Sequence, residues 1–153
     1  MKQILFVCTG NTCRSPMAEV LFNRLAALEQ PGYGFRAVSA GLSANGGDHA
    51  STNAAKVIKS YSGADLSCHR ARELSCDDVD SAYLVLTMSK NHKQYILSMC
   101  PGAYQKVFTL KEYVYGASED ISDPYGSSET VYRHCADEIA QAVEMLAEKV
   151  KFL

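Results

Sequence analysis

The sequence of 153 residues contains no tryptophan, only four prolines and no apolar run near the ~18 residues that would indicate a membrane-spanning helix. Its formal net charge of −2 excludes a general electrostatic attraction to nucleic acid or to an anionic membrane. The apolar stretch at the N-terminus is too short for a signal peptide, and no small-residue cleavage site follows it. We therefore expect a cytoplasmic protein whose partners include neither nucleic acid nor membrane.

Linkers, internal repeats and low-complexity tracts are also absent from the sequence. Hydrophobic residues make up 47% and charged residues 21% of the chain, proportions that are typical of a soluble globular protein. A chain of this length can bury a core without the help of disulfides or metals. The sequence predicts one domain over residues 1–153, and it makes no prediction of oligomeric state.

Short apolar runs alternate with segments of helical periodicity. The runs predict strands at residues 4–7, 35–40, 82–87 and 106–110. Helices are expected from Pro16 to before Pro31, over residues 50–61, after Ser89 as N-cap, and at the C-terminus. The first and last helices carry apolar faces on Met17, Leu21, Leu25 and Leu28, and on Val131, Cys135, Ile139, Val143, Leu146 and Val150. Strands that alternate with helices indicate an α/β fold, a parallel sheet flanked by helices on both faces.

The six cysteines are residues 8, 13, 68, 76, 100 and 135. Thiols are kept reduced in the cytoplasm, so four of these residues are interpreted as small core or surface side chains: Cys68, Cys76, Cys100 and Cys135. Cys8 and Cys13 have the spacing of half a metal-ligand set. No second cysteine pair or His-x-x-x-His follows at zinc-finger spacing. We therefore expect neither a metal nor another cofactor.

The residues between the first strand and the first helix carry the chemistry that an anion site needs. Ligands of a parallel sheet collect beyond the carboxyl ends of its strands, where the next helix offers unpaired N–H groups. Gly10 lets the loop curl so that successive amides point inward, and Arg14 adds a planar fork for phosphate oxygens. The same positive field stabilises the thiolate form of Cys8, which then faces a bound phosphate as a nucleophile. This stretch predicts a phosphate-binding loop with a reactive cysteine.

Several segments of the chain resemble the low-molecular-weight protein tyrosine phosphatase family, in the same order and spacing. Residues 8–15 resemble its catalytic loop, and residues 39–41 match its Ser-Ala-Gly. Residues 68–72 resemble its His-x-Ala-Arg segment, and residues 123–126 its Asp-Pro-aromatic loop. The resemblance covers nearly the whole chain, and it implies a four-stranded parallel sheet flanked by helices.

The resemblance also implies a role for each matching residue. Cys8 is expected to be the nucleophile, Arg14 the clamp of the phosphate and Asp123 the general acid. The other substrate-binding or phosphate-binding positions are Thr9, Gly10, Asn11, Thr12, Cys13 and Tyr125. The residues expected to support the loop are Asn11, Ser39, His69 and Ser15, whose hydroxyl bonds to the thiolate. By itself, the segment 123–126 predicts a β-turn with proline at its second position and glycine at its fourth.

The function that this resemblance implies is that of a cysteine-dependent, metal-independent protein phosphatase with a phosphocysteine intermediate. Its partners are phosphorylated proteins, and its loop holds phosphate or another oxyanion. Thr12 stands where tyrosine-specific members usually carry an aliphatic residue, and residues 45–49 stand where an aromatic wall is frequent. Gly126 and residues 108–114 look like the bacterial protein arginine phosphatase branch. A hydroxyl suits a guanidinium, so we expect phosphoarginine as the substrate. Phosphotyrosine is the alternative, because Tyr125 can flank either group.

Two further interpretations belong to other classes of protein. Arsenate reductases share this fold and loop, but they need additional cysteines near the third strand, and the cysteines here do not match that placement. A non-enzymatic phosphate or redox sensor is disfavoured by the presence of Asp123. A reversible disulfide between Cys8 and Cys13, which protects the nucleophile from over-oxidation, is a hypothesis compatible with the enzymatic interpretation.

Overall fold

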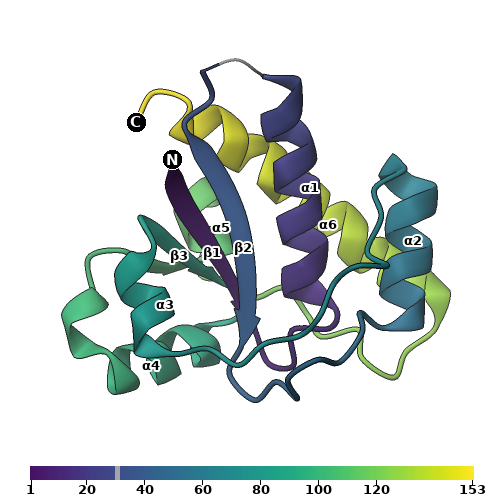
Figure 1. The fold of residues 1–153 in the computed structure, drawn as a ribbon, viewed down its shortest axis with the longest axis horizontal. Coiled ribbons are helices and arrows are strands. Elements are labelled where there is room, and N and C mark those ends of the chain that lie inside the picture. The colour runs from purple at the N-terminus through teal and green to yellow at the C-terminus, as the bar shows by residue number, and fades with distance from the viewer. Residues whose placement is uncertain (30–31) are drawn as a thin grey trace.

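The computed structural model describes residues 1–29 and 32–153. The strands in these residues form one parallel sheet in the order β2-β1-β3-β4 (Figure 1). They are β1 (Lys2–Cys8), β2 (Phe35–Gly41), β3 (Leu84–Thr87) and β4 (Val107–Thr109). The prediction of a four-stranded parallel sheet is confirmed, and the strands lie where the apolar runs place them.

Helices follow each strand. They are α1 (Arg14–Leu28), α2 (Thr52–Ser62), α3 (Cys76–Ser81), α4 (Lys90–Met99), the 3-10 turn η1 (Pro101–Ala103), α5 (Leu110–Tyr115) and α6 (Glu129–Val150). The sequence predicts α1, α2, α4 and α6, and the break expected at Pro31 lies outside the described residues. It misses α3 and α5, which are too short to show a period, although each begins with a capping box. No helix in residues 1–29 and 32–153 is long and apolar enough to cross a membrane.

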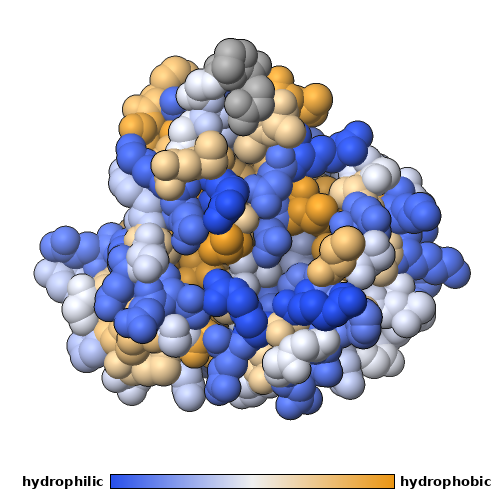
Figure 2. Space-filling model, in the orientation of Figure 1, coloured by the Kyte–Doolittle hydropathy of each residue, from blue (hydrophilic) through white to orange (hydrophobic). Residues whose placement is uncertain are grey.

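Successive residues of β1 point to opposite faces of the sheet and enter two separate cores. Ile4 and Phe6 pack with apolar side chains of α1, α2, α5 and α6. Leu5 and Val7 pack with side chains of α3 and α4 on the other face. The expected single domain with helices on both faces of the sheet is confirmed (Figure 1). Figure 2 shows the consequence for the surface, where hydrophilic side chains cover most of the face in view and hydrophobic ones form small groups between them.

Two residues assigned to apolar helix faces lie outside the core. Leu28 is 76% exposed in the last turn of α1, and Val131 is 43% exposed near the start of α6. The cause at Val131 is helix geometry, because each step of four residues rotates the side chain by about 40° around the axis. Val131 lies two such steps before Ile139, so its side chain is rotated away from the face on which Ile139 and Val143 are buried.

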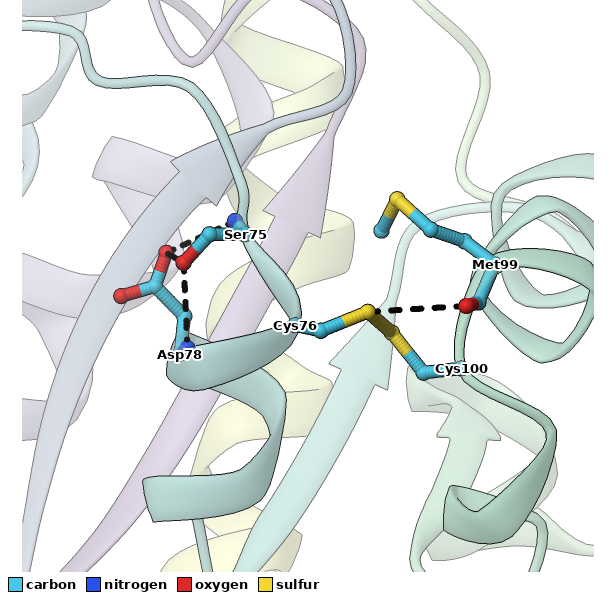
Figure 3. The surroundings of a disulfide bond; sticks show 5 residues. All are labelled: Ser75, Cys76, Asp78, Met99 and Cys100. Atoms are coloured by element: carbon cyan, nitrogen blue, oxygen red, sulfur yellow. Dashed lines mark hydrogen bonds between the residues drawn. A yellow bond between two sulfur atoms is a disulfide. The ribbon is translucent and has the colours of Figure 1, made fainter.

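The interpretation of the cysteines as reduced thiols is wrong at one pair. Cys76, the first residue of α3, forms a disulfide with Cys100, which follows α4 (Figure 3). The two residues are 24 positions apart in the sequence, and their Cα atoms lie 6.0 Å apart. The positions of the two cysteines in the sequence do not indicate this disulfide. The two residues come together only because α3 and α4 pack on the same face of the sheet. The free thiols are those of Cys8, Cys13, Cys68 and Cys135.

Candidate active site

The loop between β1 and α1 lies at the carboxyl edge of the sheet (Figure 1). β1 pairs with β2 on one side and with β3 on the other, so the chain leaves this edge in opposite directions. Such a reversal of strand order opens a crevice in which ligands of parallel sheets bind. The loop therefore lies where the sequence predicts an anion site.

Hydrogen bonds fix the carbonyl groups of the loop on its outer side. The carbonyls of Cys8, Thr9 and Thr12 accept from the backbone N–H groups of residues 42, 43 and 51, at 3.0, 2.9 and 2.9 Å. Asn11 has the left-handed backbone conformation, with a φ of 56°, which curls the loop. The C=O and the N–H of one peptide unit point in opposite directions, so these bonds turn the following N–H groups inward. This is the arrangement of an anion-binding nest.

Gly41, the last residue of β2, lets the loop approach the sheet. A Cβ at this position would lie 2.6 Å from the carbonyl oxygen of Thr9 and 2.8 Å from the backbone nitrogen of Asn11. Neither backbone atom can move without opening the loop. The Ser-Ala-Gly segment ends on Gly41 and so gives a signal for it, although the resemblance implies a role only for Ser39.

The Asn11 side chain is fully buried and connects the loop to its supports. Its Nδ2 donates to Ser15 Oγ at 2.8 Å and to Ser39 Oγ at 3.0 Å. Its Oδ1 accepts from the backbone N–H of Arg72 at 3.0 Å. The ring Nε2 of His69 donates to the Asn11 carbonyl oxygen at 2.7 Å. The structure therefore brings together the residues that the resemblance implies as supports of the loop.

Cys8 is the last residue of β1, and its thiol is buried at the base of the loop. Ser15 Oγ lies 2.9 Å from Cys8 Sγ. The Ser15 oxygen already accepts a hydrogen bond from Asn11 Nδ2, so its own hydroxyl proton is free to point at the sulfur. A hydrogen bond in that direction stabilises a thiolate.

Arg14 is 5% exposed and directs its guanidinium across the loop toward the segment 121–123. One terminal nitrogen donates to the carbonyl oxygen of Ile121 at 2.8 Å, and the other lies 3.5 Å from Asp123 Oδ2. Arg14 Nε has no hydrogen-bond partner among the described residues. Part of the planar fork is therefore left for an anion in the loop.

The segment that carries Asp123 forms a turn one residue later than the sequence predicts. Ser127 N donates to the Pro124 carbonyl at 2.9 Å, which places Tyr125 and Gly126 at the centre of the turn. Gly126 has a φ of 77°, a conformation that favours glycine. The reason for the shift is that Asp123 Oδ1 accepts from Tyr125 N at 3.1 Å and so caps the turn from outside. The Asp123 side chain is 49% exposed.

A pocket of about 240 Å³ opens above the loop. The predicted site residues that line it are Cys8, Thr9, Gly10, Thr12, Cys13, Arg14, Asp123 and Tyr125. Asn11, Ser15 and Ser39 are buried, and they support the loop from outside the pocket lining. Three further residues line the pocket, namely Ser43, Asn45 and Asp48, in the loop that follows β2. Asn45 and Asp48 belong to residues 45–49, which stand where an aromatic wall is frequent in the family, whereas no sequence signal indicates Ser43.

Long-range contacts add two residues that no local pattern indicates. Tyr132 of α6 places its hydroxyl 3.2 Å from Cys13 Sγ, and burial, with a smaller effect of Cys13, raises the pKa of Tyr132 to about 12. His92 of α4 places Nε2 2.9 Å from Thr9 Oγ1. Burial lowers the pKa of His92 to about 4, so its ring is neutral at neutral pH. Neither contact could be read from spacing, because each joins residues far apart in the chain.

The fold and the pocket together define a class of enzyme. A parallel sheet, a nest after its first strand and a pocket shared by a thiol, a guanidinium and a carboxyl group are the parts of a cysteine-based phosphatase. The profile of the low molecular weight phosphotyrosine protein phosphatase family matches residues 3–152, and the chain belongs to this family.

Relatives with assigned activities are similar over almost the whole chain. The protein-arginine-phosphatase of Geobacillus stearothermophilus is 43% identical, over 97% of this chain and 96% of the relative. The low molecular weight protein-tyrosine-phosphatase PtpB of Staphylococcus epidermidis is 39% identical, over 98% and 97%. A solved structure of the YwlE arginine phosphatase, a cysteine-to-serine mutant with a phosphorylated active site serine, has a TM-score of 0.92 and 40% identity, over 97% of this chain and 95% of that chain. The protein is thus a protein phosphatase, a hydrolase.

Proposed function

We propose that the protein removes phosphate from phosphoarginine in cytoplasmic proteins, with one catalytic domain over residues 1–153 and no metal or other cofactor. The observation that carries this proposal is the polar wall of the pocket. Tyr125 is the one aromatic residue in the described lining, and the rest of the rim offers hydroxyl, amide and carboxyl groups. A phenol ring gains most from apolar and aromatic walls, whereas a guanidinium gains from oxygen acceptors near its plane.

Thr12 has the central place in this wall. It is partly buried in the pocket lining, and a Cβ added at Gly10 would lie 3.6 Å from its hydroxyl oxygen. A hydroxyl in the pocket lining is within reach of the group that enters the pocket with the phosphate. There it can accept an N–H from a phosphorylated guanidinium. The 43% identity to a protein-arginine-phosphatase supports the same substrate.

In the first step, the Cys8 thiolate attacks phosphorus in line with the bond that breaks. The inward N–H groups of the loop and the free part of the Arg14 guanidinium hold the phosphoryl oxygens as their charge redistributes. Protonated Asp123 transfers its proton to the departing guanidine nitrogen. The products of this step are an unmodified arginine and a phosphocysteine at Cys8.

In the second step, water attacks the phosphocysteine and Asp123 accepts the proton of that water. The phosphorus–sulfur bond breaks, inorganic phosphate leaves, and Cys8 returns as a thiolate. The hydroxyl of Ser15 stabilises this leaving thiolate from 2.9 Å. The phosphate product occupies the nest before release, so the oxyanion partner of the loop is the product itself. Nucleic acid and membrane are not among the proposed partners.

Phosphotyrosine is the second candidate substrate, and one observation favours it. Tyr125 is 74% exposed at the mouth of the pocket, where an aromatic ring can stack on a phenol. The relative from Staphylococcus epidermidis, at 39% identity, is named a protein-tyrosine-phosphatase.

The test compares kcat/KM for two peptides of one sequence, one with phosphoarginine and one with phosphotyrosine, in the presence of a chelator. We expect the wild type to prefer phosphoarginine and Thr12→Ile to shift the preference toward phosphotyrosine by about tenfold or more. Cys8→Ser should lose turnover on both peptides. A wild type that prefers phosphotyrosine by a wide margin contradicts the proposed substrate, and full activity of Cys8→Ser contradicts the mechanism.

A further inference from the structure

His92 lies next to the loop between β1 and α1, and its ring forms a hydrogen bond with Thr9 of that loop. The residue is 7% exposed in the first turn of α4, where its backbone N–H donates to Ser89 Oγ at 3.2 Å. Its Nε2 is 2.9 Å from Thr9 Oγ1. Its Nδ1 has no hydrogen-bond partner among the described residues. The mechanism proposed above does not use this buried, half-satisfied side chain.

A neutral His92 ring carries one proton, and the contact with Thr9 together with the unpartnered Nδ1 favours Nε2 as its position. Burial lowers the pKa of His92, and the positive charge of Arg14 acts in the same direction. Asp120 and Asp123 oppose the shift, and the pKa stays at about 4, so the ring is neutral. A buried N–H without a partner is rarer than an unpaired acceptor. The arrangement that leaves no buried N–H unpaired has the proton on Nε2, which donates to Thr9 Oγ1, and the bare lone pair on Nδ1.

The hydrogen bond from His92 restricts the rotation of the Thr9 hydroxyl, so the Thr9 oxygen has a fixed position in the pocket lining. Thr9 Oγ1 uses one lone pair for His92 and keeps the other, together with its own proton. Thr9, Gly10 and Thr12 all line the pocket, and a Cβ added at Gly10 would lie 3.6 Å from the Thr12 hydroxyl oxygen. Two residues with hydroxyl groups thus line the pocket, and one of these hydroxyls is oriented by a buried ring.

We propose that Thr9 is a second specificity-determining residue, which accepts an N–H of the phosphorylated guanidinium, and that His92 is the positioning residue that orients its hydroxyl. This inference rests on the proposed function and deepens it. A phosphorylated guanidinium keeps N–H groups next to the bond that breaks, whereas an aryl phosphate has no donor there. Loss of an acceptor that was placed for an N–H therefore penalises the guanidinium substrate selectively.

The experiment measures kcat and KM for a phosphoarginine peptide and for p-nitrophenyl phosphate. The readout is the ratio of the two kcat/KM values, guanidinium over aryl. Thr9→Val and His92→Leu should each lower this ratio by about tenfold, mainly through a higher KM for the peptide. Thr9→Ser keeps the hydroxyl and His92→Gln keeps an N–H donor near the position of Nε2, so both should restore most of the ratio. Gln94→Leu, an exposed change on α4, is the matched control.

A double variant separates positioning from support of the fold. If His92 acts through Thr9, adding His92→Leu to Thr9→Val should lower the ratio no further. Additive effects on the ratio, or equal losses on both substrates, would overturn the proposal. If the His92→Leu protein does not fold, His92→Gln and Thr9→Val still test the proposal. Thr9 is exposed, so its replacement by valine should leave the fold intact.

The wild-type protein distinguishes failure of this inference from failure of the proposed function. A wild type that prefers a phosphotyrosine peptide contradicts the phosphoarginine assignment, whatever the variants do. A wild type that prefers phosphoarginine but whose ratio is unchanged by Thr9→Val overturns the role of Thr9 and His92 alone.

Discussion

Ser15 Oγ lies 2.9 Å from Cys8 Sγ, and the same oxygen accepts a hydrogen bond from Asn11 Nδ2 at 2.8 Å. The serine is therefore a directed donor, because its acceptor capacity is partly used and its proton is available to the sulfur. All three side chains are buried, which strengthens a hydrogen bond to a charged sulfur relative to the same bond in water. The loop thus stabilises its thiolate from below, opposite the side on which the phosphate binds.

Ser15→Ala should slow turnover by about tenfold, since the thiolate loses its hydrogen bond both as attacking group and as leaving group. The alkylation of Cys8 by iodoacetamide at fixed pH should slow as well. Steady-state kinetics and mass spectrometry of the alkylated peptide measure the two effects. Ser43→Ala, which removes a hydroxyl of the pocket lining and leaves the contact between Ser15 and Cys8 intact, is the control. Equal behaviour of the two variants would show that the contact with Cys8 has no special effect.

Gly41→Ala should destabilise the protein by about 2 kcal/mol and lower activity, because the new Cβ meets the Thr9 carbonyl at 2.6 Å. Gly34→Ala is the matched control, since no heavy atom lies within 4 Å of a Cβ at that position. Urea unfolding of both variants gives the free energies of unfolding. A Gly41→Ala protein as stable and as active as Gly34→Ala would contradict the close approach of loop and sheet.

The Cys76–Cys100 disulfide should stabilise the protein by about 3 kcal/mol, because it closes a loop of 24 residues in the unfolded chain. Unfolding in urea with and without a reductant measures this difference. The double variant Cys76→Ser/Cys100→Ser should match the reduced wild type and should not respond to the reductant. Cys68→Ser, at an exposed free thiol, should behave as wild type. No effect of reductant on the wild type would contradict the disulfide.

Acid should destabilise the protein through His92. The pKa of this histidine is lowered by burial from 6.5 to about 4, so between these two pH values only the unfolded chain binds the proton. Stability is therefore unaffected by His92 above pH 6.5, falls as the pH drops toward 4, and changes no further below it. The loss is on the order of 3 kcal/mol. Urea unfolding across this range should show a smaller dependence on pH for His92→Gln, and an unchanged dependence would exclude a neutral, buried ring.

Peroxide should convert Cys8 to a sulfenic acid, which the Cys13 thiol then attacks with loss of water to form a disulfide. Cys13 has to leave the Tyr132 hydroxyl, 3.2 Å away, to do so, and Tyr132→Phe should therefore accelerate the reaction. Peptide mass spectrometry after peroxide detects the bond, and a reductant should restore activity. If Cys13→Ser recovers from peroxide as well as the wild type, Cys13 does not protect the nucleophile.

Much of the fold and of the loop could be predicted from the sequence, because local signals specify them. β1 is an apolar run, Gly10 and Arg14 have the chemistry of an anion loop, and α1 begins at Arg14, two residues before the predicted start at Pro16. The segments around Ser39 and His69 follow from resemblance, and the structure places both residues against Asn11.

The features that could not be predicted depend on packing between distant segments. Thr9 and His92 are 83 positions apart, and nothing near either residue indicates the other. Cys76 and Cys100 meet only because α3 and α4 cover the same face of the sheet. The turn after Asp123 is shifted because a side-chain hydrogen bond competes with the backbone pattern that proline and glycine favour.

The most direct measurement is peptide mass spectrometry of the enzyme, quenched in alkaline denaturant within milliseconds of mixing with a phosphoarginine peptide, because the P–N and P–S bonds both persist in alkali. The account predicts one added phosphoryl group on the peptide that contains Cys8, its disappearance as the substrate is consumed, and no such group in Cys8→Ala. Turnover of phosphoarginine with no phosphorylated Cys8 peptide at any time, or with full activity in Cys8→Ala, would contradict it.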